Sequence, residues 1–220
     1  SIGAGASESE RAELETLGAR WLSSLPGSTP LTVRTLTPTI ATAAPIEPMA
    51  IAGGFGGGMT AVTLDLRTTG GANLILRDIE FVAVSGAATL TGGRGEQFVT
   101  ADSAIQHIVL GAGDDRLYGG GGDDTVGSRG GDDRVFGGEG DDIVFGGAGG
   151  DAATGEAGDD LVVGGAGHDN LGGGWGDDLL LGGRGADAMR GSGGDDRLEG
   201  GEGGDKLAGG RGDDHALGGE

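Results

Sequence analysis

The 220-residue chain contains no cysteine, a single lysine, three histidines and only 4% aromatic residues. Without cysteine there is no disulfide framework and no thiolate metal site, and three histidines cannot ligate a metal in every unit of a repeated structure. Catalytic signatures are missing as well, since the sequence holds no His-Glu-x-x-His, Gly-x-Ser-x-Gly or Gly-Lys-Ser/Thr motif. These absences predict that the chain is not an enzyme.

Positive charge is also scarce, because 14 Lys and Arg face 35 Asp and Glu, for a net charge of −21. So acidic a chain is not expected to bind nucleic acid. No apolar run approaches the length of a transmembrane helix. Residues 1–25 lack the basic, apolar and cleavage regions of a signal peptide. The sequence therefore predicts neither a nucleic-acid partner nor a membrane span.

Glycine and aspartate are abundant, because a nine-residue unit repeats from residue 110 to residue 217. Twelve consecutive units follow the pattern Gly-Gly-x-Gly-x-Asp-x-apolar-x without a change of phase, and their fourth position is always glycine. The eighth position is always apolar, filled in turn by Leu117, Val126, Val135, Val144, Ala153, Val162, Leu171, Leu180, Met189, Leu198, Leu207 and Ala216. A solvated linker or an acidic tail has no reason to keep that position apolar, so the array predicts a regular fold.

The repeat resembles the RTX (repeats-in-toxin) nonapeptide over about half of the chain. The resemblance implies an all-β fold, a right-handed parallel β-roll loaded with calcium. In that fold six residues of each unit form a metal-binding turn and three form a short strand, with successive units on opposite sides of a flattened coil. A three-residue strand points only its middle residue inward, which here is the apolar eighth position.

The sixth position of each unit is the candidate metal ligand. It is occupied by Asp115, Asp124, Asp133, Asp142, Asp151, Asp160, Asp169, Asp178, Asp187, Asp196, Asp205 and Asp214. One aspartate in an isolated turn binds a cation poorly, whereas stacked turns bring carboxylates and backbone carbonyls together. Ca²⁺ takes about six to eight oxygen ligands, so these aspartates are predicted to bind multiple calcium ions, up to about ten.

The net charge of the repeat array links calcium binding to folding. From residue 110 to residue 217 there are 20 Asp and 4 Glu against 8 Lys and Arg, a net charge of −16. Without metal, this charge and one apolar side chain per nine residues cannot offset the entropy of the chain. The array is therefore expected to be disordered without calcium and folded with it.

Some positions depart from the repeat. Ser128 replaces a first-position glycine, which marks its unit as the weakest calcium turn, and Ala153 and Ala216 fill the core least. Upstream of the array, apolar residues continue in the same phase at Ile108, Val99, Leu90 and Phe81, but Gln97 and Gln106 stand where aspartate is expected. Residues 74–109 are therefore predicted to form metal-free coils of the same solenoid, with an unrelated β-hairpin as the alternative.

The remaining upstream sequence predicts separate elements. Ser7 and Glu10 form a capping-box pattern before helical apolar spacing over residues 8–25, and residues 31–37 and 59–68 alternate like strands. We divide the chain into residues 1–58 (a helix and a Pro/Gly-rich segment), 59–109 (an irregular β cap with metal-free coils) and 110–220 (the β-roll). Since it lacks an initial Met and stops early in a thirteenth unit, the sequence is expected to be a piece of a longer polypeptide.

The outward-facing seventh and ninth positions differ between odd and even units. In three successive even units they are apolar, and the resulting block consists of Ile143, Phe145, Leu161, Val163, Leu179 and Leu181. Such a block predicts a face covered by a protein partner or a second copy. Aliphatic residues also suit strands in general, and that alternative stays open.

The predicted function is a calcium-binding β-roll of a secreted or cell-surface bacterial protein, which folds on Ca²⁺ after type I export and acts as a structural or interaction scaffold. Extracellular calcium is abundant enough to fill weak oxygen sites. The alternative is a secretion and folding module of an RTX toxin or hydrolase whose catalytic domain lies outside this chain. The three histidines, His107, His168 and His215, are expected to face solvent, and the tripeptide Arg211-Gly212-Asp213 is explained by the repeat.

Overall fold

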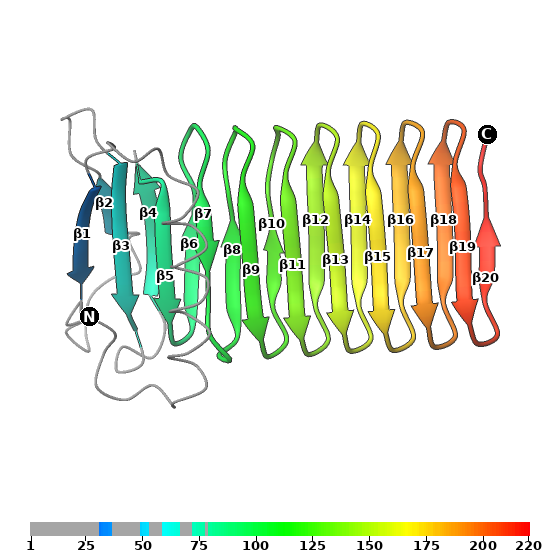
Figure 1. Cartoon of the computed structure of the whole chain (residues 1–220), viewed down its shortest axis with the longest axis horizontal. Coiled ribbons are helices and arrows are strands. Elements are labelled where there is room, and N and C mark those ends of the chain that lie inside the picture. Colours follow the sequence, from blue (N-terminus) through cyan, green and yellow to red (C-terminus); the bar gives the residue numbers. More distant parts are fainter. Residues whose placement is uncertain (1–30, 37–48, 53–58, 67–71, 78) are drawn as a thin grey trace.

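The computed structural model describes residues 31–36, 49–52, 59–66, 72–77 and 79–220, and these residues contain strands but no helix. The strands stack side by side along one long axis (Figure 1). In chain order they are β1 (Leu31–Leu36), β2 (Met49–Ala52), β3 (Met59–Asp65), β4 (Ala72–Arg77), β5 (Phe81–Ser85), β6 (Ala88–Thr91), β7 (Phe98–Thr100), β8 (Gln106–Val109), β9 (Arg116–Gly121), β10 (Thr125–Gly127), β11 (Arg134–Glu139), β12 (Ile143–Ala148), β13 (Ala152–Ala157), β14 (Leu161–Ala166), β15 (Asn170–Trp175), β16 (Leu179–Arg184), β17 (Ala188–Gly193), β18 (Arg197–Glu202), β19 (Lys206–Arg211) and β20 (His215–Leu217).

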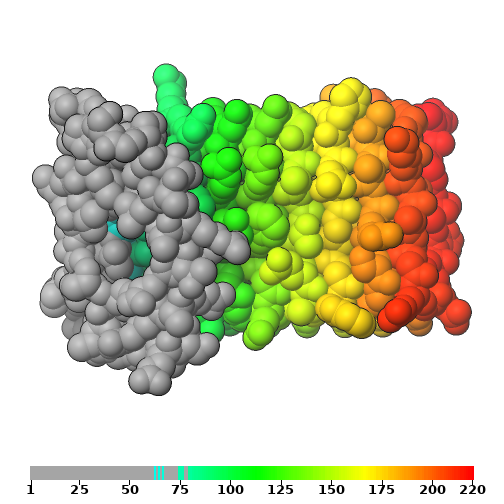
Figure 2. All heavy atoms as spheres, viewed as in Figure 1, coloured from blue at the N-terminus to red at the C-terminus, as the bar shows by residue number. Residues whose placement is uncertain are grey.

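The strands form two ten-stranded sheets, one of odd-numbered and one of even-numbered strands. All pairs are parallel, and in the repeat each residue pairs with the residue one 18-residue coil later, as Val144 does with Val162. Consecutive strands therefore lie in opposite sheets and build a solenoid, which confirms the parallel β-roll. The repeat coils form an unbroken surface from green to red in Figure 2. The helix predicted for residues 8–25 lies outside the described residues.

Most strands of the repeat have six residues, not the predicted three. β14, for example, joins the last three positions of one unit to the first three of the next, and only the fourth to sixth positions form the turn. Parallel pairing continues into the glycines, as between Gly147 and Gly165. Two positions per strand therefore face inward, the apolar eighth (Val162) and the first-position glycine (Gly164), and both are buried.

The core is a column of eighth-position side chains between the sheets. Those from Leu117 to Leu198 are at most 3% exposed and belong to one apolar cluster with upstream residues such as Leu90 and Leu64. Leu207 is only partly buried and Ala216 is exposed, since no further described coil covers them. Ala153 is fully buried despite its small size.

The upstream coils continue the same sheets. β5 and β7 pair in parallel and β7 pairs with β9, so the aspartate-rich and glutamine-containing coils share one ladder and the hairpin alternative is wrong. The sequence phase predicted Phe81 in the inward row. The structure puts Val82 there instead, because Val82 pairs with Val99. This coil is one residue shorter than the 18-residue repeat, and Phe81 instead stacks on Phe98, with ring centroids 5.3 Å apart.

Candidate metal-binding turns

The sixth-position aspartates line the two edges of the roll. Odd and even units place them in two rows, which are Asp115, Asp133, Asp151, Asp169, Asp187 and Asp205 on one edge and Asp124, Asp142, Asp160, Asp178, Asp196 and Asp214 on the other. All from Asp115 to Asp196 are at most 3% exposed, while Asp205 is half-buried and Asp214 is exposed on the last coil. Carboxylates this deeply buried need compensating partners.

One oxygen of each carboxylate has such a partner. The backbone N–H of Asp115 donates to Asp133 Oδ1 at 2.7 Å, and the same bond recurs between successive coils of both rows as far as Asp196 N and Asp214 Oδ1, at 3.0 Å. The bond fixes each carboxylate toward the preceding coil. It also ties each aspartate to the coil above and to the coil below.

The second oxygen has no partner. Ten buried Oδ2 atoms accept no hydrogen bond, namely those of Asp124, Asp133, Asp142, Asp151, Asp160, Asp169, Asp178, Asp187, Asp196 and Asp205. A buried acceptor without a donor costs free energy, and a column of anionic ones costs more. The repeated orphaned oxygen is what a bound cation would satisfy.

The first-position glycine makes room for that oxygen. A Cβ at Gly155 would collide with Asp160 Oδ2, and the same holds at Gly173 and Asp178. Any side chain at the first position would thus occupy the space into which the carboxylate points. The predominance of glycine at the first position is explained by this contact, and not by backbone conformation alone.

Burial raises the pKa of these carboxyl groups. It brings the pKa of Asp160 from 3.8 to about 7, and the like charges of Asp178 and Asp142 raise it further, although the N–H of Asp142 lowers it. Asp124 also rises to about 7, and the pKa values of Asp115, Asp142, Asp151 and Asp178 rise to about 6, with burial as the largest cause. Packing alone therefore disfavours the charged form that calcium requires.

The donor set fits a hard, oxygen-seeking cation. Cysteine is absent, and within the described residues no three His, Asp or Glu side chains converge on one point. Side chains alone therefore cannot complete a coordination shell, and backbone carbonyls of the turns must contribute. Carboxylate and carbonyl oxygens together are the ligands of Ca²⁺.

Ser128 contacts the sixth-position aspartate of another unit, because Asp115 lies in the unit of residues 110–118. Asp133, in the unit that begins at Ser128, keeps its orphaned Oδ2. The Ser128 hydroxyl lies 3.3 Å from both Asp115 Oδ2 and the carbonyl oxygen of Gly111. Asp115 is accordingly not among the orphaned carboxylates. The Ser128 hydroxyl thus gives Asp115 Oδ2 a partner, whereas a cation would be the partner of this oxygen in other turns.

Glutamine replaces aspartate in the upstream coils. Gln97 is buried, accepts the N–H of Gly93 through Oε1, and donates Nε2 to the carbonyl oxygen of Ile79 at 3.1 Å. Gln106 donates Nε2 to Asp102 Oδ1 at 3.2 Å. A neutral amide carries its own donor, but Gln106 Oε1 is buried without a hydrogen-bond partner, so the metal-free state of these coils stays a prediction.

A second ladder of aspartates at the fifth position was missed from the sequence. Asp123 Oδ1 accepts the N–H of Asp141, and the bond repeats along that edge to Asp213. The opposite edge lacks most of these aspartates, and there His168 Nδ1 accepts the N–H of Ala186 at 2.8 Å. All three histidines are exposed as predicted, but His168 also has this role. Separating the fifth positions of odd and even units would have revealed the ladder.

The predicted partner-binding residues do lie together on the outer face of the even sheet. Ile143, Leu161 and Leu179 are paired neighbours in β12, β14 and β16, as are Phe145, Val163 and Leu181. Ile143 is 43% exposed and the other five are half-buried. An ion pair between Arg197 and Glu199, 2.6 Å long, follows in β18. We call these six residues the apolar block.

A family model for the RTX calcium-binding nonapeptide repeat matches residues 100–135, 128–153, 145–180, 154–189 and 190–220, and so spans the chain from residue 100 to its last residue. No curated protein and no solved structure gives a significant match. In the described part of the chain there is no helix long and apolar enough to cross a membrane. The matched segment contains all twelve sixth-position aspartates.

Proposed function

The chain belongs to the RTX calcium-binding nonapeptide repeat family, and from this premise we propose that its twelve sixth-position aspartates hold a column of Ca²⁺ ions along each edge of the roll. Up to about ten ions would occupy the spaces between stacked turns. When bound, they supply positive charge to buried carboxylates, so the roll folds with calcium and serves as a scaffold without catalytic activity.

The ten orphaned Oδ2 atoms carry this proposal. They recur at one position of the repeat, they are buried, and all except Asp133 Oδ2 point over a first-position glycine that leaves space for them. A structural water would not require an ionisable group at every unit. A cation requires it.

Counting bound ions by native mass spectrometry tests the proposal. Wild-type protein should bind about ten Ca²⁺ ions, whereas protein with Asn in place of Asp142, Asp160 and Asp178 should bind several fewer. A variant with Asn at the exposed fifth-position residues Asp141, Asp159 and Asp177 is the matched control and should keep its count. Equal counts in all three proteins would contradict the proposal.

We further propose that the roll works outside the cell, where millimolar calcium fills weak oxygen-ligand sites, and that it reaches that location by type I secretion. The second candidate is a secretion and folding module that serves a toxin or hydrolase domain elsewhere in the polypeptide. Expression with and without a type I exporter tests export. Calcium-loaded, folded protein that accumulates only in the cytosol would contradict both versions.

The apolar block favours the scaffold version, because it gives the roll a surface for a protein partner or a second copy. Replacing Leu161 and Leu179 with Lys should abolish association while calcium uptake remains. Arg197→Ala, beside the block, is the control and should still associate. If calcium-loaded wild-type protein stays monomeric at high concentration and captures no partner through this face, the interaction role fails.

A further inference from the structure

One turn edge carries an exposed tryptophan that the calcium-binding repeat does not explain. Trp175 occupies the third position of its unit, at the end of β15, and is 69% exposed. Elsewhere in the repeat, the third position holds small or charged residues. So exposed an indole buries little apolar surface and adds little to folding stability.

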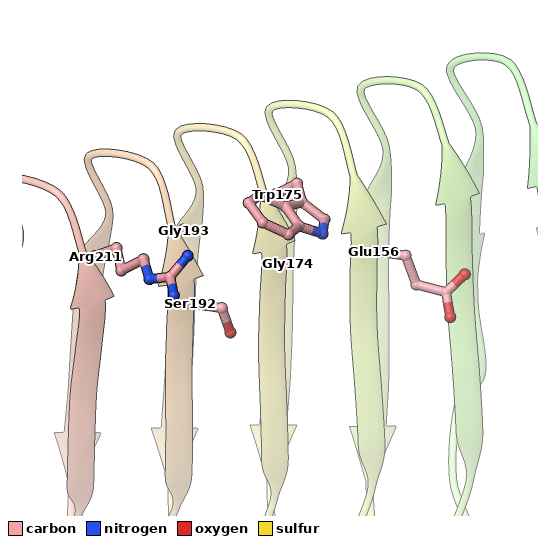
Figure 3. Close-up of a pocket in the computed structure, with 6 residues that line it drawn as sticks. All are labelled: Glu156, Gly174, Trp175, Ser192, Gly193 and Arg211. Carbon is pink, nitrogen blue, oxygen red and sulfur yellow. The ribbon is translucent and has the colours of Figure 1, made fainter.

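The residues beside Trp175 leave its ring accessible. Its paired neighbours on either side are Ala157 and Gly193, neither of which has a side chain large enough to cover an indole. A Cβ placed on Gly193 would lie 3.4 Å from the ring, so the ring leans over β17 and rests against the glycine. Figure 3 shows the indole lying across the end of β15. The indole ring packs against Gly193 on one side, and the rest of the ring is exposed to solvent.

The same place holds the only two non-glycine residues with positive φ in the described part of the chain, Glu156 at 86° and Ser192 at 95°. Both occupy the second position, where the repeat has glycine, and both pair with Gly174, the residue before Trp175. Side chains in this conformation are strained. Strain on both sides of an exposed aromatic residue suggests that these side chains are retained for a purpose other than folding.

These residues surround a hollow of about 490 Å³, lined by Glu156, Gly174, Trp175, Ser192, Gly193 and Arg211. Gly174 and Gly193 form a floor without side chains, and Arg211 extends from β19 toward Gly193 (Figure 3). The lining thus combines a flat aromatic surface with the Arg211 guanidinium and the Ser192 hydroxyl, whereas the Glu156 carboxylate extends away from Trp175 (Figure 3). Its size is within the range of small-ligand sites.

We propose that this hollow binds a saccharide, with one pyranose ring stacked on Trp175. The C–H face of a sugar ring packs on an indole, and its hydroxyls need both donors and acceptors around the edge. Arg211 supplies donors, and the Ser192 hydroxyl both donates and accepts. A purely apolar ligand would make no use of these two polar groups, and a compact cation would be repelled by Arg211.

Calorimetry and tryptophan fluorescence on the calcium-loaded chain test the proposal, with hexasaccharides of β-1,4-glucose, α-1,4-glucose, β-1,4-N-acetylglucosamine and a β-1,4-linked uronic acid as probes. At least one neutral probe should bind and shift the tryptophan emission to shorter wavelength. Trp175→Ala should weaken that binding at least about tenfold without changing calcium uptake, because the side chain is exposed. Arg211→Ala should weaken it too, whereas Arg184→Ala, at the third position of an odd unit, should not.

Ser192→Gly provides an independent readout. Restoring the repeat glycine relieves the positive φ, so the thermal midpoint should rise while saccharide binding weakens. If Ser192 had only a structural role, the thermal midpoint would change without a loss of saccharide binding. If only the uronic acid probe binds, the ligand is anionic and not a neutral saccharide. That result would overturn the proposal. Failure of every probe to bind at millimolar concentration, or equal binding by Trp175→Ala, would overturn it completely.

Discussion

Each sixth-position aspartate has two tasks, which the two carboxylate oxygens divide between them. For Asp160, Oδ1 accepts the N–H of Asp142 in the preceding coil, while Oδ2 is buried without a donor. Its own N–H donates to Asp178 Oδ1 in the next coil. An interior aspartate therefore contributes to the ladder and, under the proposed function, to a metal position as well, whereas the exposed Asp214 ends its row.

Asp160→Ala should consequently be more damaging than Asp214→Ala. The interior change removes oxygens from about two ion positions and leaves the N–H of Asp142 without its acceptor, a loss of about 1–3 kcal/mol from the hydrogen bond alone. Calcium titrations of both variants, followed by circular dichroism, measure the difference. Equal stoichiometry and equal midpoints would argue against shared sites.

Calcium affinity should depend on pH in a defined direction. Burial raises the pKa of Asp124 and Asp160 in the folded, metal-free chain to about 7, above the 3.8 of an exposed aspartate. Protons therefore stabilise the metal-free fold at low pH, and this contribution is lost as the pH rises through about 6 to 7. Because Ca²⁺ needs the ionised carboxylates, its affinity should fall on acidification through the same window.

Titrations at pH 8.0 and pH 5.5 test this competition, with an expected loss of at least about tenfold in affinity at the lower pH. Identical midpoints at both pH values would show that protons and calcium do not share these carboxylates.

Ser128→Gly should create a stronger calcium turn, since it removes the hydroxyl beside Asp115 Oδ2 and the Cβ that the other units lack. We expect about one additional ion or a tighter weakest site. Ser128→Ala removes the hydroxyl but retains the Cβ, and so should restore less. Isothermal titration of the three proteins distinguishes them, and a lower affinity in the glycine variant would show that the serine assists calcium binding.

At the scale of strands, the eighth-position residues predicted the inward row correctly, because a period of nine with two strands per coil keeps Val126, Val144 and Val162 in one column. Strand length was not predictable from apolar pattern. The first three positions carry mostly glycine, whose lack of a side chain hides that its backbone pairs with the next coil, as Gly165 pairs with Gly183. Positive φ at Glu156 and Ser192 was equally invisible, since the pattern treats both as simple substitutions.

Aromatic stacking joins the glutamine-containing coils to the first aspartate-rich coils. Tyr118 of β9 lies between Phe98 of β7 and Phe136 of β11, with ring centroids 5.6 Å and 4.7 Å away. Tyr118→Ala should lower the free energy of unfolding of the calcium-loaded protein by about 1–3 kcal/mol, because two ring contacts are lost. Thr154→Ala, at the same repeat position without a ring partner, is the control. Denaturant unfolding measures both, and equal losses would show that the stack adds nothing.

At the scale of the whole molecule, charge repulsion determines whether the β-roll can fold. The chain carries a net charge of −21, and its folded state brings rows of aspartates together in buried positions. One apolar column of modest side chains must hold this arrangement together, and in the repeat it receives only one residue from each nine. Neutralisation by bound Ca²⁺ removes the repulsion and satisfies the orphaned oxygens, so folding and metal binding should be one transition.

Hydrogen exchange of the full chain during a calcium titration tests this claim most directly. In excess chelator, amides of residues 110–217 should exchange as in an unfolded chain, and added Ca²⁺ should protect them cooperatively, together with a rise in β-sheet circular dichroism. Mg²⁺ at equal concentration should not substitute, because it holds its water and demands a smaller octahedral site. A repeat region that is fully protected in excess chelator would contradict the account.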